Sequence, residues 1–214
     1  MLILSKDMPI TDLTLLLIAT AAALYGYINY GLKIPKRQLA PRPFTWLIWG
    51  ILSTCVTIIQ INNGADLGTV GALLGAVSGY VLAAMAWRYG KRRIYPTDIA
   101  SLTFAAIVLL AWVFVGDAVT AVAATVVYMV GFIPTVARGW KAPHKEGQAP
   151  FAMSVVKYTI SFMLLGVVTI ETAVYPVMLA LANLAFIIML RLRRSALSSP
   201  SKSMKPRKRS KSQK

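Results

Sequence analysis

One lysine within an apolar stretch carries the most evident chemistry in the chain. Lys157 lies in the run 151–170, with Ser154 at i−3, Ser161 at i+4 and Tyr158 beside it. On a helix the two serines would share its face. A charge at the centre of a bilayer costs roughly 2.5–3.5 kcal/mol and needs a partner or water. Two interpretations stay open: an anion-binding group that lines a cavity, or a lysine whose ammonium snorkels to nearby headgroups.

A second set of polar side chains follows one face of the stretch 44–61. Trp49, Ser53, Thr57 and Gln60 are spaced i, i+4, i+8 and i+11, which places them on one side of a helix. A polar stripe with an aromatic ring at one end suits a wet cavity that binds a small polar solute. Serine and threonine hydroxyls also bond back to their own helix, so a structural role stays open.

The sequence does not indicate an enzyme. Its single histidine, His144, lies in a connecting segment, so an imidazole cannot activate a serine within an apolar run. There is no HExxH zinc motif and no pair of aspartates within the apolar runs. We therefore predict no catalytic residue, no metal site and no cofactor.

The composition is that of an integral membrane protein. Hydrophobic residues make up 57% and charged residues 14% of the 214 residues, against about 45–50% and 25% in soluble domains, and the mean hydropathy is +0.64. Apolar runs of about 18 residues or more predict an all-α, polytopic fold. Its seven predicted spans are residues 12–32, 44–61, 67–87, 97–115, 118–137, 151–170 and 172–190.

The charged residues alternate between the connections of these spans. Of the 23 Lys and Arg residues, ten lie between Arg191 and Lys214, and most others lie in the first, third and fifth connections. The remaining connections carry Asp66, Asp117 and Glu171 but no Lys or Arg. Because basic short loops stay in the cytosol, we predict a plasma or inner membrane protein with its N-terminus outside and its C-terminus cytosolic. This distribution makes nucleic acid an unexpected partner, despite a net charge of +16.

The chain also contains a weak internal repeat of three spans. A shift of 105 residues aligns polar positions in register: Asp12 with Asp117, Asp66 with Glu171, and Ser78 with Asn183. Each copy has three spans, so its two ends lie on opposite sides of the membrane. A fourth span between the copies gives the second copy the same orientation as the first, which makes the repeats parallel. The predicted units are a first three-helix repeat at 1–93, a linker helix at 94–116, a second three-helix repeat at 117–194, and a disordered basic cytosolic tail at 195–214 that lies on anionic lipid.

This 3+1+3 plan resembles the SWEET and PQ-loop superfamily of transporters over nearly the whole chain except the tail. The local likeness is the segment 131–135, Gly-Phe-Ile-Pro-Thr, followed by a basic stretch through Lys141, although Thr135 stands where the motif has Gln. The resemblance implies a hinge for alternating access in the fifth span, at Gly131 and Pro134. A static kink, caused by the hydrogen bond that a proline cannot donate, is the alternative.

Paired asparagines in the third and seventh spans of SWEET transporters contact the substrate. Asn183 matches one of them, and Ser78 replaces the other. We therefore predict that Ser78 and Asn183 face one another across a central cavity, with ordinary hydrogen bonding between helices as the alternative. The candidate substrate-binding residues are Asn183, Ser78, Lys157, Trp49, Ser53 and Thr57.

Together these features predict a membrane transporter that moves a small polar solute, sugar-like or another small metabolite, by alternating access through a central cavity. A receptor or binding protein of the same seven-span fold that does not transport is the alternative. The expected partners are the small-molecule solute and anionic lipid of the bilayer. Self-association into a homo-oligomer is left open.

Overall fold

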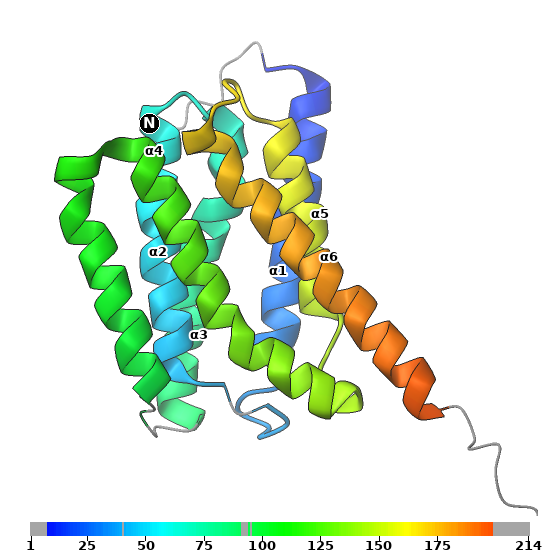
Figure 1. Ribbon diagram of the computed structural model, residues 1–214. Helices are drawn as coiled ribbons and strands as arrows, with labels where there is room; N and C mark the ends of the chain where they lie inside the picture. Colours follow the sequence, from blue (N-terminus) through cyan, green and yellow to red (C-terminus); the bar gives the residue numbers. More distant parts are fainter. Residues whose placement is uncertain (1–7, 40, 91–93, 95, 199–214) are drawn as a thin grey trace, which may run out of the picture.

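The described part of this chain is built from helices alone. A computed structural model describes residues 8–39, 41–90, 94 and 96–198, and these contain no strand. The basic tail beyond residue 198 lies outside the described residues. Two short 3-10 helices, η1 (Asp66–Thr69) and η2 (Pro143–Lys145), accompany the α-helices α1 (Ile10–Gly31), α2 (Pro43–Asn62), α3 (Val70–Tyr89), α4 (Pro96–Lys141), α5 (Ala149–Met163) and α6 (Ile170–Ser198) (Figure 1).

Five of these helices are long and apolar enough to cross a membrane: α1, α2, α3 with η1, α4 and α6. Their outward faces are apolar as well. Leu110 is 74% exposed, and Val113 and Phe114 are each 88% exposed. Soluble proteins rarely expose such continuous apolar surface. The fold is therefore that of a membrane protein in composition and in surface, and the seven-span plan stays a prediction.

The longest helix, α4, is bent at Gly116. That residue has φ 78° and ψ 176°, which lies outside the helical region and is accessible essentially to glycine only. The carboxylate of Asp117 accepts hydrogen bonds from Trp112 Nε1 at 2.6 Å and from Asn63 Nδ2 at 2.7 Å. These contacts hold the bend against the end of α2. The two arms of α4 run in opposite directions (Figure 1).

The predicted sixth span, 151–170, extends too far. Helix α5 ends at Met163, and α6 begins at Ile170. Between them, Val167 N donates to Gly64 O at 3.0 Å and Gly166 N to Ala65 O at 3.5 Å. The chain leaves the helix because this turn binds the loop after α2, which is a tertiary contact that apolar periodicity does not reveal.

The helices alternate between two ends of the molecule. Helix α3 contacts both α2 and α1, α6 contacts both α5 and α4, α1 packs on α5, and α2 packs on α4. The C-terminal ends of α1, α3, α4 and α6 lie at one end of the molecule (Figure 1). Apart from the buried Lys157, the described Lys and Arg residues lie at this end, so we refer to it as the basic end. The turns after α2 and α5 and the bend of α4 lie at the opposite end.

Candidate functional site

A cavity of about 80 Å³ opens between helices at the basic end. Its mouth is formed by Pro41 and Arg42 before α2, Arg138 near the end of α4, and Glu146 before α5. Its inner part reaches Asn183, near the middle of α6. Eight aromatic side chains contribute to the wall: Tyr27, Tyr30, Trp46, Trp49, Tyr128, Phe132, Phe151 and Tyr158.

This volume bounds what the cavity can hold in the conformation described. A water needs roughly 10–15 Å³ by this measure, and ligand pockets commonly reach about 300 Å³ or more. The cavity therefore accommodates a few waters or one small solute. A larger solute would require the helices to move apart.

Four of the predicted site residues line this cavity: Asn183, Trp49, Gly131 and Pro134. Asn183 is 7% exposed, and its Nδ2 donates to Leu179 O at 2.7 Å on its own helix. This bond fixes the side chain at the inner end of the cavity. The role in substrate contact stays a prediction.

Trp49 forms the centre of the aromatic wall. Its indole stacks on Tyr128, with ring centroids 5.0 Å apart and planes 12° apart, and its Nε1 donates to Tyr128 O at 3.2 Å. Gly131 permits this packing, because a Cβ at that position would lie 2.9 Å from Trp49 Nε1. The predicted hinge glycine thus has a visible packing role between α4 and α2.

Pro134 lines the cavity without interrupting α4. The backbone of that helix leaves helical dihedral angles at Gly116 and not at Pro134. The departure at Gly116 falls between the predicted fourth and fifth spans, 97–115 and 118–137, and is therefore separate from the kink or hinge predicted at Pro134. A hinge at Pro134 stays a prediction that requires a second conformation.

Lys157 lies beneath the inner end of the cavity and is not among the residues that line it. Its side chain is 0% exposed. Its Nζ donates to Tyr27 Oη at 2.8 Å and lies 3.9 Å from the centre of the Tyr158 ring. Both tyrosines line the cavity, so one layer of side chains separates the ammonium from it. An ammonium enclosed in this way does not snorkel to headgroups.

The polar stripe of α2 does not line the cavity beyond Trp49. Ser53 Oγ and Tyr175 Oη are 2.8 Å apart, and Thr57 Oγ1 donates to Ser53 O at 2.7 Å. Gln60 Nε2 donates to Thr172 O at 2.7 Å. The prediction that Ser53 and Thr57 face a wet cavity is wrong for this conformation, because their hydroxyls bond to α6 and to their own helix. The stripe ties α2 to α6.

Ser78 is not where the repeat predicts it. Its hydroxyl donates to Leu74 O at 2.6 Å, and the residue lines a separate groove between α1 and α3. Ser78 and Asn183 therefore do not face one another across one cavity. A serine hydroxyl is short enough to bond back to the preceding helical turn, so the residue needs no partner across a cavity.

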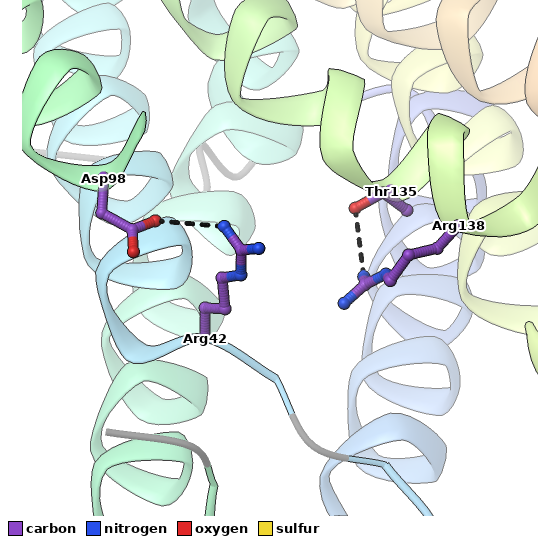
Figure 2. Close-up of polar contacts among 4 residues, drawn as sticks. All are labelled: Arg42, Asp98, Thr135 and Arg138. Atoms are coloured by element: carbon purple, nitrogen blue, oxygen red, sulfur yellow. Dashed lines mark hydrogen bonds and ion pairs between the residues drawn. The ribbon is translucent and has the colours of Figure 1, made fainter. Parts of the chain in front are cut away.

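Two arginines at the mouth are the site residues that sequence reasoning missed. Arg42 Nη1 lies 3.6 Å from Asp98 Oδ1, and Arg138 Nη2 donates to Thr135 Oγ1 at 3.4 Å (Figure 2). Arg138 Nε also lies 3.4 Å from Glu146 Oε1. In the sequence both arginines are indistinguishable from loop charges that set topology. Their positions, directly before one predicted span and directly after another, are the only signal that the sequence offers.

Glu146 is partly buried at this mouth. Burial raises the pKa of its carboxyl above the ordinary range, and the nearby Arg138 guanidinium opposes that rise. The ion pair is therefore weak enough for burial to dominate, which agrees with its length of 3.4 Å.

Across the part of the chain that the structure describes, no group of three His, Cys, Asp or Glu side chains could hold a metal ion. The cavity is lined by cationic, aromatic, amide and hydroxyl side chains and by the carboxylate of Glu146, groups that can bind a solute by hydrogen bonds, charge and stacking. No protein-family model, curated protein or solved structure matches this chain. The resemblance to SWEET and PQ-loop transporters accordingly stays a prediction.

Proposed function

We propose that this protein is a membrane transporter that moves a small polar solute by alternating access through the cavity at the basic end. The observation that carries the proposal is the form of this cavity. Its lining includes Arg42 at the mouth and Asn183 in the middle of α6. Where Tyr158 lines it, the buried hydroxyls of Tyr158, Tyr175 and Ser53 pair with one another behind the wall. A site that is reached from one end and closed toward the other is what alternating access requires.

The packing of the helices supports the proposed two-repeat plan. Helix α3 lies against α1 and α2 as α6 lies against the paired helices α4 and α5. The two groups contact each other through α1 with α5 and through α2 with α4. Each of these pairs joins the first helix of one proposed repeat to the second helix of the other. Parallel repeats of this kind place a solute site at their interface, and the cavity lies between α1 and α2 on one side and α4, α5 and α6 on the other.

In this proposal the chain crosses the bilayer seven times, with the basic end in the cytosol. The arms of α4, 96–115 and 117–141, rise about 30 Å and about 37 Å at 1.5 Å per residue. Each arm is long enough for one crossing. Helix α5 rises only about 22 Å and spans the membrane together with the turn 164–169 that follows it. The basic residues of the cytosolic end follow the rule that keeps such loops inside.

The test begins with the purified protein and a panel of small sugars, carboxylates and amines. A bound solute raises the melting temperature by mass action, so the panel selects candidate solutes by their binding alone. Each candidate is then measured for counterflow in proteoliposomes. The proposal requires saturable counterflow of at least one stabilising solute. Stabilisation without counterflow by any of them would contradict transport and favour a binding receptor.

A further inference from the structure

We propose that the solute of this cavity is a small organic anion, whose negative group docks between Arg42 and Arg138 and whose body packs against the aromatic wall. This inference rests on the proposed function for its site and names the class of solute. It is carried by the two guanidinium groups. They come from different segments of the chain and lie on two sides of one mouth (Figure 2). A guanidinium binds carboxylate or phosphate through two parallel N–H groups.

The ion pairs that these arginines make with Asp98 and Glu146 are longer than ordinary charge-assisted hydrogen bonds. Charge-assisted N–H···O bonds are usually about 2.7–2.9 Å long, whereas Arg42 and Asp98 are 3.6 Å apart and Arg138 and Glu146 are 3.4 Å apart. Arg138 uses Nε for Glu146 and Nη2 for Thr135. Among the described residues its Nη1 has no partner, so an incoming anion can bind there without displacing either contact.

The surroundings of the cavity are positive on more than one side. Glu146 is the one carboxylate among the described residues that line it. At the inner end, Lys157 lies behind Tyr27 and Tyr158, and in the described chain no acidic side chain contacts its ammonium. A buried cation without a counter-ion is costly, and an anion in the cavity would reduce that cost.

Two helices also begin at this cavity. The first turns of α2 and α5 contribute Trp46 and Phe151 to the wall, and neither helix has a side-chain cap on its N-terminal N–H groups. Helix N-termini favour negative charge. This adds to the field of the arginines and would not define a site without them.

The wall and the volume restrict the rest of the solute. Trp49, Phe132 and Phe151 present ring faces and edges to the cavity, and Asn183 lies at its inner end. At about 80 Å³ the cavity has room for a few waters or one small solute. We therefore expect the body of the anion to be no larger than a single ring and to pack against aromatic side chains.

The test compares anions with neutral molecules of the same shape. Benzoate and benzamide, glucuronate and glucose, and inorganic phosphate are titrated into detergent-purified protein. Binding is followed by intrinsic tryptophan fluorescence, to which Trp46 and Trp49 at the cavity contribute. At least one anion should bind about tenfold more tightly than its neutral twin. Arg42→Gln and Arg138→Gln should each weaken its binding about tenfold. Arg138→Gln should leave the melting temperature unchanged, whereas Arg42→Gln should lower it, because it removes an ion-pair partner of the buried Asp98. Arg138→Lys should recover part of the loss.

Matched controls separate a built site from general positive charge. Lys141 and Arg191 are exposed basic residues of the same end and do not line the cavity, so Lys141→Gln and Arg191→Gln should bind as the wild type does. Equal loss in these controls, equal binding of the neutral twins, or no binding of any anion would overturn the inference. Nanodiscs with and without phosphatidylglycerol test the other source of phosphate. If the arginine variants lose only lipid binding, the ligand is a headgroup and the inference is wrong.

The outcome is distinguishable from that of the transport proposal. Anion binding that depends on both arginines, without counterflow, would leave this inference intact and contradict transport. Saturable counterflow of neutral solutes, with no preference for anions, would support transport and contradict this inference.

Discussion

The two ends of this molecule are built from different kinds of contact. At the end of the α4 bend, Asp117 binds Trp112 and Asn63 over 2.6 and 2.7 Å, and Gln60 binds the α6 backbone over 2.7 Å. At the basic end, the ion pairs of the mouth are 3.4 and 3.6 Å long and a cavity lies between them. The end of the α4 bend is closed by short hydrogen bonds, whereas the cavity mouth holds two longer ion pairs beside the short hydrogen bonds from Arg194 Nη2 to Pro143 O at 2.8 Å and to Glu146 O at 2.7 Å. A cavity open at one end and closed at the other is the form that the proposed transporter would have in one of its two states.

The closed end should be the more sensitive of the two. Asp117→Ala removes two hydrogen bonds to a carboxylate, and such bonds contribute roughly 1.5–3 kcal/mol each. We expect the free energy of unfolding to fall by about 3 kcal/mol, measured by thermal melting in detergent. Asp12→Ala is the control, because this carboxylate accepts one exposed bond from Thr11 at 3.4 Å. Equal losses in the two variants would contradict the closed-end account.

The bend itself should contribute next. Gly116→Ala places a side chain at φ 78° and ψ 176°, and such residues cost on the order of 1–3 kcal/mol. A Cβ at this position would meet nothing within 4 Å, so backbone strain alone predicts a loss of about 2 kcal/mol. Gly147→Ala in the loop before α5 should change stability by less than about 0.5 kcal/mol. A tolerated Gly116→Ala would mean that the arms of α4 can straighten.

Lys157 lies between the two ends, and its substitution sharpens the comparison. Lys157→Met keeps the volume and removes a buried charge, which is often neutral or stabilising. We expect unfolding free energy to be unchanged or raised by about 1 kcal/mol, while the anion identified by titration binds about threefold more weakly. Melting and fluorescence titration measure the two effects. Unchanged anion binding would remove Lys157 from the site, and a marked loss of stability would show that its charge is satisfied in the fold.

The smallest effect on stability is expected at the mouth of the cavity. Because burial raises the pKa of Glu146, the carboxyl stabilises the fold at pH values below the unfolded-state pKa of about 4.3. This contribution is lost as the pH rises through the folded-state pKa. Relative to wild type, Glu146→Gln should therefore become more stable from pH 4 to pH 7, by a few tenths of a kcal/mol. The opposite slope in melting experiments would mean that the pair with Arg138 dominates.

Apolar runs and loop charges predicted much of the fold. The helices, the gathering of basic residues at one end and the position of Trp49 at the cavity follow from patterns along the chain. The repeat and the resemblance to SWEET transporters predict Asn183 at a cavity, and it lines one. Contacts between distant segments were not predictable in this way. The early end of α5 depends on Gly166 meeting Ala65, and the burial of Ser53 depends on Tyr175. One sequence also cannot separate an arginine that sets topology from one that lines a mouth.

The most direct test of the transport account measures access to the cavity from both sides of the membrane. Cys55 is the single cysteine, so Cys55→Ala provides a cysteine-free background, and Ser154→Cys adds a near-isosteric thiol at the cavity wall. A membrane-impermeant maleimide is applied to right-side-out and inside-out vesicles. We predict labelling from both sides, faster from the cytosolic side, with the balance shifted when solute is added. Labelling from one side only, unaffected by any solute, would contradict alternating access.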